Sequence, residues 1–429
     1  MQEELATPWE SPQSKAGLLE QFDGDTVLSP GGDQRPMMPQ VGVVALVPDH
    51  WKREWQPRHQ IMSRLARHFN VVWVNPAPHW REISRARRAS PSPAPGMQIY
   101  DPDVWLPQVH RPAALSEMLL RGRVMRARRL LKARGVTRFV LYVWRPEFAA
   151  AVGTGGFDLT CYHIDDEYTF SSADRPIRSR ERRLLEDVDQ VFIHSRTLMM
   201  KKGHVNPNTL RVPNGVDLRA FSGPGPLPPD LAAVPGPRIG YAGYLKDQLD
   251  WRLLTDIAQA RPDWSLVLVG VDKVRSPENR QLLDALLART NVYALGEKTT
   301  DELALYPRHF DVCIMPYVRD GYTRYIYPLK LHEYLATGRP VVGTPIDTLL
   351  EYGDVVSLAR SSGEWVSSIA NALAGEHPAR AAARIAVAAR HDWDILTRRI
   401  ADTIASRLEI GGRPASARPA ERSPSETAA

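Results

Sequence analysis

The feature that most constrains the fold of this chain is an alternation of short apolar runs with helical patterns, which stops at a proline-rich segment and then starts again. Runs such as 41–48 (VGVVALVP) and 264–270 (WSLVLVG) are almost wholly apolar, as is typical of strands buried on both faces of a parallel sheet. Such strands alternating with helices predict βαβ units. The predicted strands are 41–48, 71–75, 139–144, 159–164, 190–195, 238–244, 264–270, 291–296, 311–317 and 340–344. We therefore expect an α/β protein with two Rossmann-like domains, whose ligand binds in the cleft between the carboxyl ends of two parallel sheets.

The segment 213–237 divides the chain, because it holds seven prolines and has the composition of a linker. The two ends of the chain lack periodicity, which predicts disordered tails. The expected organisation is a tail (1–37), an N-terminal Rossmann-like domain (38–212), the linker (213–237), a C-terminal Rossmann-like domain (238–388), a C-terminal helix (389–410) and a second tail (411–429).

Composition and the cysteine positions argue against a secreted, disulfide-built protein and against a membrane-spanning one. An apolar content of 43% and a charged content of 24% are typical of a globular protein. Cys161 and Cys313 lie in predicted strands without CxxC spacing, so we expect them to be buried and reduced. The N-terminus has no signal pattern, and no apolar stretch is long enough to span a bilayer, so we expect a cytoplasmic protein.

Positive charge is concentrated between residues 79 and 134. This segment holds twelve Arg and Lys residues against four acids, whereas the whole chain has a net charge of +6. It fits a solvated helix face, a surface that binds anionic phospholipid, or a nucleic-acid contact. Leucines and methionines mark one side of the helix predicted at 116–134, which favours a membrane surface. No stacking-aromatic pattern interleaves with the arginines, which weakens the nucleic-acid case, so we expect no nucleic-acid partner.

The stretch 324–344 (RYIYPLKLHEYLATGRPVVGT) carries the strongest candidate site. Pro328 suits the start of a helix, since it lacks an N–H that would have no partner there. The N–H groups of Leu329 and Lys330 and the positive helix end then form an anion site, to which Lys330 adds a charge. Glu333 lies about one turn further along the same face, where it can accept both hydroxyls of a ribose. These groups fit a nucleoside diphosphate, although an ordinary amphipathic surface helix would carry the same residues.

The same stretch resembles the donor-binding signature of the retaining GT-B glycosyltransferases, the glycosyl transferases group 1 superfamily. That family carries two glutamates eight residues apart, which flank the sugar and the ribose. Glu333 matches the second glutamate, and the first falls on Tyr325, which departs from the family pattern. The form P-L-K-L-x-E-Y resembles enzymes of teichuronic acid and other surface-polysaccharide synthesis. The resemblance implies a GT-B fold, in which the C-terminal domain binds a nucleotide-sugar donor and the N-terminal domain binds the acceptor.

Three further stretches are similar to the same family. Residues 212–221 (VPNGVDLRAF) resemble the end of its N-terminal domain, 240–251 (GYAGYLKDQLDW) the first strand and loop of its C-terminal domain, and 389–400 (ARHDWDILTRRI) the terminal helix that crosses back to the first domain. In that loop a glycine lets the backbone approach the diphosphate and a basic residue neutralises it. The resemblance therefore implies Gly243 and Lys246 as donor-binding residues, beside Leu329, Lys330, Glu333 and the position of Tyr325.

The N-terminal half offers candidates for the acceptor side. Residues 55–76 resemble the opening of the same subset of enzymes, which implies Arg58 and His59 as acceptor-side residues. A polar helix start is the alternative for both.

An acidic cluster follows the strand predicted at 159–164. The stretch YHIDDEYTF resembles an acidic segment of the same relatives, with His163 in place of an acid. Clustered acids raise one another's pKa, which suits a proton acceptor or hydroxyl binder. We take His163, Asp165 and Asp166 as candidate catalytic residues, and a helix cap is the alternative for the two aspartates.

The sequence thus predicts a glycosyltransferase that moves a sugar from a UDP- or GDP-sugar to a glycan or lipid-linked acceptor, with retention, in surface-polysaccharide synthesis. We expect no cofactor and no metal, since lysines and a helix dipole would neutralise the leaving diphosphate. An anionic membrane surface, contacted through the basic segment 79–134, is the expected further partner. Two alternatives stay open: a non-catalytic nucleotide-sugar or membrane-binding protein with a degenerate site, and a GT-B sugar-nucleotide epimerase.

Overall fold

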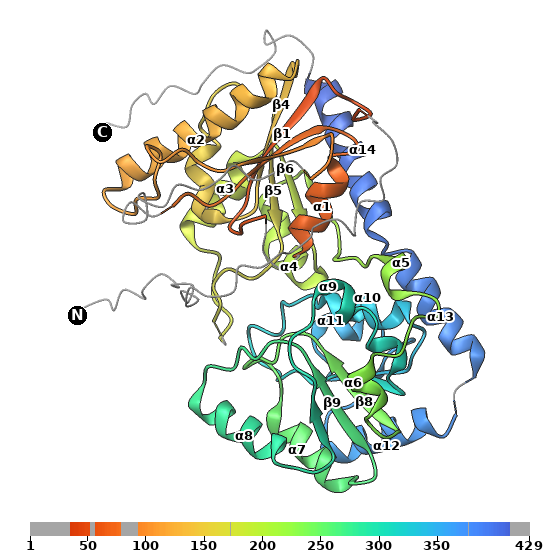
Figure 1. Cartoon of the computed structure of the whole chain (residues 1–429). Coiled ribbons are helices and arrows are strands. Elements are labelled where there is room, and N and C mark those ends of the chain that lie inside the picture. Colours follow the sequence, from red (N-terminus) through yellow and green to blue (C-terminus); the bar gives the residue numbers. More distant parts are fainter. Residues whose placement is uncertain (1–34, 52–55, 79–92, 172, 376, 412–429) are drawn as a thin grey trace, which may run out of the picture.

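The computed structural model describes residues 35–51, 56–78, 93–171, 173–375 and 377–411. They form two α/β domains, one above the other in Figure 1. The N-terminal sheet has the strand order β3-β2-β1-β4-β5-β6-β7, and the C-terminal sheet has the order β10-β9-β8-β11-β12-β13. All neighbouring strands are parallel. The predicted fold class is confirmed.

The N-terminal domain alternates strands with helices, as the apolar runs predict. Its elements are β1 (Val41–Leu46), α1 (Pro57–Leu65), β2 (Asn70–Val74), β3 (Met97–Tyr100), α2 (Ala113–Ala133), β4 (Arg138–Val143), β5 (Leu159–Ile164), α3 (Ser179–Asp187), β6 (Gln190–Ile193), α4 (Arg196–Lys202) and β7 (Thr209–Arg211).

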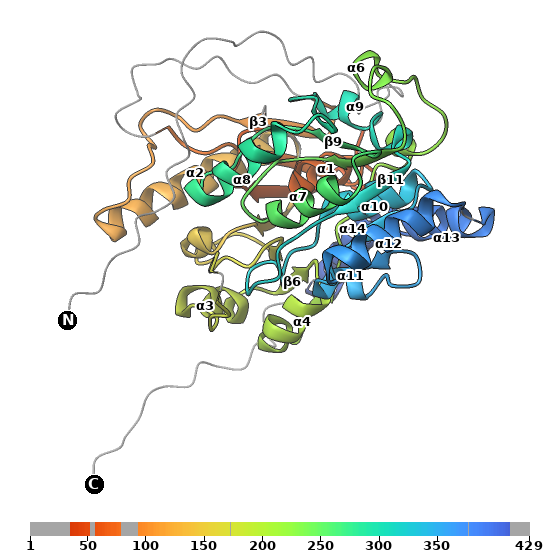
Figure 2. The same ribbon diagram turned by 90° about the horizontal axis from the view of Figure 1, so that it is seen from below.

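The C-terminal domain repeats this pattern. Its elements are α5 (Leu218–Phe221), α6 (Pro229–Ala232), β8 (Arg238–Ala242), α7 (Trp251–Ala260), β9 (Ser265–Val269), α8 (Pro277–Leu287), β10 (Val292–Ala294), α9 (Thr300–Leu303), β11 (Val312–Met315), α10 (Leu329–Ala336), β12 (Val341–Gly343), α11 (Asp347–Leu350), β13 (Ser357–Leu358), α12 (Ser362–Leu373) and α13 (Pro378–Ala389). Seen from below, α10 lies beside α13 (Figure 2).

The order of strands reverses once in each sheet, between β1 and β4 and between β8 and β11. Loops that leave the carboxyl ends of the strands diverge at such a point and leave a crevice, where open α/β sheets bind ligands. The loops that follow β4, β8 and β11 are therefore placed to form a site.

The last helix, α14 (Trp393–Gly411), belongs to the N-terminal domain in space (Figure 1). It packs beside α1, and Trp393, Ile400 and Ile404 are buried in the same apolar cluster as β1 and β2. The chain thus passes from the first domain to the second and back.

The segment 213–237 is partly built into the C-terminal domain. It contains the short helices α5 and α6, and Phe221, Leu231 and Val234 pack in the core cluster around β8 and β9. Its prolines interrupt regular structure, but its apolar side chains still pack in the core of the C-terminal domain.

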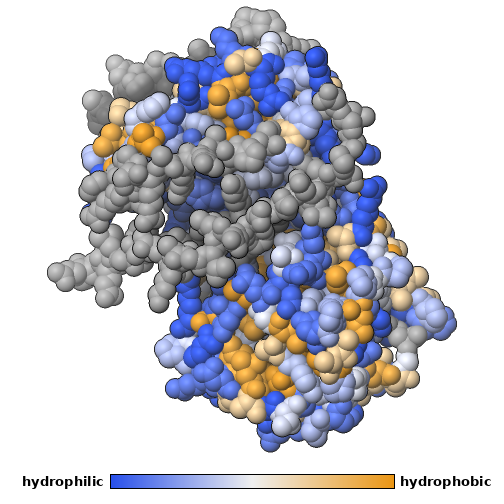
Figure 3. All heavy atoms as spheres, viewed as in Figure 1, coloured by the Kyte–Doolittle hydropathy of each residue, from blue (hydrophilic) through white to orange (hydrophobic). Residues whose placement is uncertain are grey.

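Both cysteines are free and buried, as predicted. Within the described residues, no helix is both long and apolar enough to cross a bilayer. On the face shown in Figure 3, hydrophobic side chains gather over the lower, C-terminal domain. Most of the two predicted tails, together with Trp55 and residues 79–92 of the basic segment, lies outside the described residues.

Candidate active site

The amino end of α10 and the loop after β8 meet at the switch point of the C-terminal sheet. Pro328 has extended backbone and stands just before the first helical residue, Leu329. The first N–H groups of a helix have no acceptor within the helix, so those of Leu329 and Lys330 remain available to a ligand. This end of α10 therefore presents aligned N–H donors beside a lysine.

Gly243 and Lys330, both expected to bind the donor, lie against each other. Gly243 has φ +138°, and a Cβ atom added to it would stand 2.9 Å from the Nζ atom and 3.0 Å from the Cε atom of Lys330. The Lys330 ammonium lies 4.9 Å from the ring centroid of Tyr241 and 6.0 Å from that of Tyr317. A glycine at this position leaves room for the lysine to lie over these rings.

Lys246 adds a second positive charge to the same place. Burial and, to a smaller extent, the charge of Lys330 lower the pKa of Lys246 to about 8, although Asp166 acts in the opposite direction. Burial also lowers the pKa of Lys330, but the phenol groups of Tyr317 and Tyr334 and the Glu333 carboxylate outweigh it, so the net direction is upward. Two lysines held this close are stabilised by an anion between them.

Glu333 stands one turn into α10 and is half-buried. Burial raises the pKa of its carboxyl group to about 7, against the lowering effect of Lys330. Among the described residues, none forms a hydrogen bond or a salt bridge with this carboxylate. A ligand hydroxyl could therefore occupy its oxygens.

The sequence argument missed two further glycines at the same sheet edge. Gly270 follows β9 and Gly296 follows β10, with φ +136° and +71°. The Gly243 N–H donates to Val269 at 2.8 Å, and the Gly270 N–H donates to Gly296 at 2.8 Å. A Cβ atom on Gly270 would stand 2.2 Å from the Gly243 carbonyl oxygen. A glycine after each of these predicted strands was the signal that the sequence offered. Together the three glycines let the backbones of three loops lie close together.

The acidic cluster after β5 faces these residues from the N-terminal domain. Asp165 lies 3.3 Å from Arg58 and accepts a hydrogen bond from the Tyr168 hydroxyl at 2.8 Å. Burial raises the pKa of Asp165, but Arg58 and Arg145 outweigh it and keep the pKa below its ordinary value. Asp165 is thus a fixed negative charge at the carboxyl edge of the sheet.

Asp166 has different surroundings. Burial and the neighbouring Asp165 raise the pKa of Asp166 to about 6, although Arg145 lowers it. Its Oδ2 atom accepts a hydrogen bond of 3.1 Å from the hydroxyl of Tyr322, which lies in the loop between β11 and α10. Asp166 therefore connects the two domains, and its charge also acts on the pKa of Lys246.

The two candidate histidines lie in the aromatic core of the N-terminal domain. His163 stacks on Trp144 with ring centroids 4.2 Å apart and pairs through Nδ1 with the Tyr142 hydroxyl at 2.7 Å. His59 packs against Trp73 at 4.5 Å. Burial lowers the pKa of each histidine to about 3, so both are neutral at pH 7. We propose no catalytic step for either.

Arg58 and Tyr325 join elements together. Arg58 bridges Asp49, at 2.8 Å, and Asp165. Tyr325 is only 3% exposed and belongs to the apolar cluster of the N-terminal domain, with the Lys201 ammonium 4.4 Å from its ring centroid. The position that carries the family's first glutamate is thus occupied by a tyrosine packed between domains.

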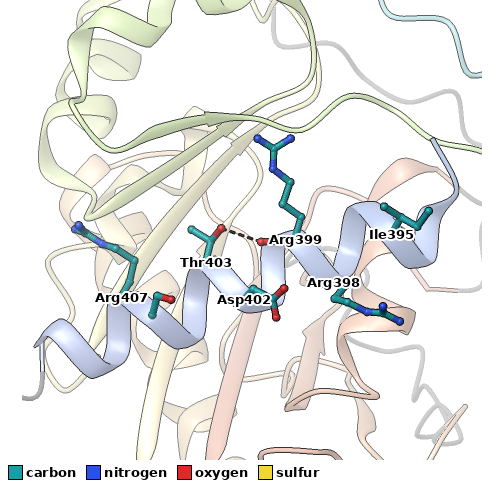
Figure 4. Close-up of a pocket in the computed structure, with 7 residues that line it drawn as sticks. Ile395, Arg398, Arg399, Asp402, Thr403 and Arg407 are labelled. Atoms are coloured by element: carbon teal, nitrogen blue, oxygen red, sulfur yellow. Dashed lines mark hydrogen bonds between the residues drawn. The ribbon is translucent and has the colours of Figure 1, made fainter. Parts of the chain in front are cut away.

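A shallow surface hollow of about 480 Å³ lies along α14, away from these residues. In Figure 4 the side chains of Arg398, Arg399 and Arg407 point in different directions, and the Thr403 hydroxyl donates to the Arg399 carbonyl oxygen at 2.8 Å. Side chains that diverge from one helix do not converge on a ligand, so we place the site at the switch point instead. Among the described residues no group of three or more His, Cys, Asp or Glu side chains could hold a metal ion.

Comparison with known proteins finds a family for part of the chain and the fold for most of it. Residues 236–374 match the family described as glycosyl transferases group 1. The chain is 32% identical over 177 residues to a Bacillus subtilis (strain 168) protein named for teichuronic acid biosynthesis glycosyltransferase activity, TuaH. That match covers 39% of this chain and 43% of the relative, so it spans less than half of the relative's length.

Two solved structures have the same fold over most of the chain. Sucrose-phosphate synthase from Thermosynechococcus elongatus has a TM-score of 0.66 at 16% identity and covers 86% of this chain and 100% of its own. The Escherichia coli trehalose-6-phosphate protein bound with UDP-2-fluoro glucose has a TM-score of 0.64 at 12% identity, over 86% of this chain and 99% of its own. At these identities the likeness concerns the fold alone. Residues 236–374 thus match the glycosyl transferases group 1 family, and the chain has the two-domain GT-B fold.

Proposed function

We propose that this protein is a glycosyltransferase that takes a sugar from a nucleotide-diphospho-sugar. The observation that carries the proposal is the convergence of Gly243, Lys246, Lys330 and the amino end of α10 at one switch point. These groups supply two positive charges and free N–H donors, which is what a diphosphate requires. Glu333 lies one turn deeper, where its carboxylate would accept hydrogen bonds from the ribose hydroxyls of such a ligand.

In the proposed reaction the sugar leaves its diphosphate and is transferred to a hydroxyl of the acceptor. Lys246, Lys330 and the helix end stabilise the charge that develops on the diphosphate as the glycosidic bond breaks. Asp166, with its pKa of about 6, accepts a hydrogen bond from the acceptor hydroxyl and takes up its proton. Asp165 holds Arg58 and Tyr168 in place beside it. The lysines supply the charge that a divalent cation would supply, so EDTA is expected to leave activity unchanged.

The finer parts of the proposal concern donor, acceptor and outcome. We propose a UDP- or GDP-sugar as donor, a glycan or lipid-linked acceptor of surface-polysaccharide synthesis, and retention at the anomeric carbon. The relative named for teichuronic acid biosynthesis supports the acceptor class. The structure bound with UDP-2-fluoro glucose supports a nucleotide-sugar in this fold.

A membrane contact is a further part of the proposal. Trp105 is 68% and Met118 is 60% exposed, and the exposed side chains of Arg121 and Arg129 stand on the same helix as Met118. Apolar tips beside basic residues suit the headgroup region of an anionic bilayer. We expect the protein to co-sediment with phosphatidylglycerol vesicles and less with phosphatidylcholine vesicles, and Trp105→Ala to weaken that binding at equal protein stability.

The experiment on the donor site is a thermal-shift screen of UDP, GDP and ADP, followed by calorimetry with the nucleotide that stabilises most. Lys330→Ala is expected to weaken nucleotide binding by 10-fold or more, because about 1.5–3 kcal/mol is typical of hydrogen bonds to charged groups. Glu333→Ala should act similarly through the ribose. Arg360→Ala and Glu186→Ala remove exposed charges elsewhere and should leave affinity unchanged. Wild-type affinity in both site variants would overturn the assignment.

Tyr325 favours one competing function, a protein that binds a nucleotide-sugar without transferring it. The tyrosine is packed against Lys201, so no carboxylate reaches the sugar from that position. Slow release of free sugar from a UDP- or GDP-sugar distinguishes the two functions: the transferase hydrolyses its donor in the absence of acceptor, and a pure binding protein does not. Isomerisation of the donor sugar would instead indicate an epimerase.

A further inference from the structure

Phe170 has a backbone conformation that its residue type rarely adopts. Its φ is +48°, and it is the one non-glycine residue with positive φ among those that the structure describes. Its N–H donates to the Glu167 carbonyl oxygen at 3.1 Å, which closes a tight turn directly after the acidic cluster. Left-handed backbone at a bulky residue is a frequent mark of a functional position.

The turn holds the Phe170 ring in the open, beside a tyrosine of the C-terminal domain. The side chain is 55% exposed. Its ring centroid lies 6.2 Å from that of Tyr168 and 6.1 Å from that of Tyr322, which comes from the C-terminal domain. A single exposed ring is common on protein surfaces, so the left-handed backbone is what distinguishes Phe170. Since Tyr322 also donates to Asp166, the ring stands beside the proposed proton acceptor.

Arg145 approaches the same two rings from the carboxyl end of β4. Its Cζ atom lies 4.8 Å from the Tyr168 centroid and 5.4 Å from the Phe170 centroid. The guanidinium is half-buried, and no described residue accepts a hydrogen bond from it or lies within salt-bridge distance of it. The nearby carboxylates already have partners, because Asp165 pairs with Arg58 and Tyr168, and Asp166 with Tyr322.

This combination suits a ligand with two chemical features. A flat, exposed ring binds the C–H face of a sugar ring, since that face is apolar. A guanidinium with unused, planar donors binds an oxyanion through two parallel hydrogen bonds. Lys246 contributes a further positive charge from the C-terminal domain, where the charge of Asp166 acts on its pKa.

We propose that Arg145 and Phe170 form an acceptor subsite for a pyranose that carries an anionic group, either a carboxylate or a phosphate ester. The sugar ring lies on Phe170, its anion pairs with Arg145, and one of its hydroxyls faces Asp166. This inference rests on the proposed transferase function and names the chemical class of its acceptor.

The test titrates D-glucuronate, D-glucose 6-phosphate and neutral D-glucose into the full-length protein by calorimetry, at constant ionic strength. UDP or GDP is present at saturation, so that the anions cannot occupy the diphosphate site. The wild type is expected to bind at least one anionic sugar 10-fold or more tightly than glucose, and the two anionic sugars separate a carboxylate from a phosphate ligand.

Two variants then assign the binding to this subsite. Arg145→Gln should abolish the preference for the anionic sugar, and Phe170→Ala should weaken the neutral and anionic sugars alike. Arg182→Gln, which removes an exposed arginine of α3, is the matched control and should retain the wild-type preference. Nucleotide binding by each variant, measured in parallel, shows whether it is folded.

The results separate the inference from the function on which it rests. If the wild type binds nucleotide but does not prefer an anionic sugar, or if Arg145→Gln keeps the preference, the subsite proposal is wrong and the transferase proposal stands. If the anionic sugar is displaced by nucleotide, it was bound at the diphosphate site and the subsite proposal is again wrong. If the wild type binds no nucleotide, the donor site itself is wrong, and the Arg145→Gln comparison without nucleotide still decides the subsite.

Discussion

Phe170 allows backbone strain to be measured at a single residue. A left-handed conformation costs a residue with a Cβ atom about 1–2 kcal/mol, and glycine avoids that cost. Phe170→Ala removes the ring and keeps the strain, whereas Phe170→Gly removes both. We therefore expect the glycine variant to be more stable than the alanine variant by about 1 kcal/mol in urea unfolding.

The order should reverse at an ordinary exposed position of similar burial. Ile395 is 52% exposed within the helix α14, where glycine is about 1 kcal/mol less favourable than alanine. If the alanine variant is more stable than the glycine variant at both positions, Phe170 is not strained in solution.

Lys246 should set the upper pH limit of nucleotide binding. Its pKa is lowered to about 8 in the free protein by burial and by Lys330, and a bound diphosphate raises it again. Binding above pH 8 therefore requires the uptake of a proton, so affinity for UDP or GDP should fall by up to about 10-fold per pH unit.

Arginine keeps its charge throughout this range. In Lys246→Arg the fall in affinity between pH 8 and 9.5, measured by calorimetry, should be reduced or absent. A fall as steep as in the wild type would assign the titration to another group.

Below pH 7 a second decline in nucleotide affinity is expected, because Glu333 has a pKa of about 7 and becomes protonated, which leaves it a poorer acceptor for the ribose hydroxyls.

The helix α10 is held at its start by a hydrogen-bonded group of buried side chains. The Tyr327 hydroxyl pairs with His332 Nε2 at 2.9 Å and with the Tyr352 hydroxyl at 2.5 Å, and His391 stacks on His332 at 3.9 Å. Asn214 donates to the Tyr327 carbonyl oxygen at 2.8 Å. These contacts fix the residue that precedes Pro328, and hence the direction of the N–H groups that follow.

Tyr327→Phe should lower the free energy of unfolding by about 1–3 kcal/mol, because it leaves buried polar partners unpaired. It should also weaken nucleotide binding, although residue 327 is not expected to touch the ligand. Tyr293→Phe, at a half-buried tyrosine of β10, is the control. Unchanged affinity at reduced stability would show that the start of α10 is held by other contacts.

The sequence predicted elements better than the contacts between them. Apolar runs identified ten strands, and 159–164 coincides with β5 (Leu159–Ile164). The short strands β3, β7 and β13 were not predicted, because stretches of two to four residues carry too little periodicity. The helix start at Pro328, with Lys330 and Glu333 on one face, could be predicted because helix starts depend on residues within one turn. Contacts such as Tyr322 with Asp166 join residues 156 positions apart, and nothing local in the sequence indicates them.

At the scale of the whole molecule, the N-terminal domain depends on the last helix of the chain. Trp393, Leu396, Ile400, Ile404 and Leu408 complete the apolar cluster on the α1 side of its sheet. Arg64 of α1 ties this helix and the linker together through Asp394 at 2.7 Å and Asp217 at 3.0 Å. Trp393→Ala should therefore cost about 3–5 kcal/mol. In a thermal scan this loss should appear in the N-terminal domain.

The same connection predicts how the two halves behave when they are separated. Gly243, Lys246, Lys330 and Glu333 all lie within residues 216–389, which include the complete core cluster of the C-terminal domain. This fragment is expected to fold alone and to bind UDP or GDP within about 10-fold of the full-length affinity, since among the described N-terminal residues Asp166 is the group whose charge acts on the pKa of Lys246. Residues 35–211 alone lack α14 and should remain unfolded, because one face of their sheet is uncovered. Circular dichroism and calorimetry check both fragments, and a C-terminal fragment that folds without binding nucleotide would move the donor site into the space between the domains.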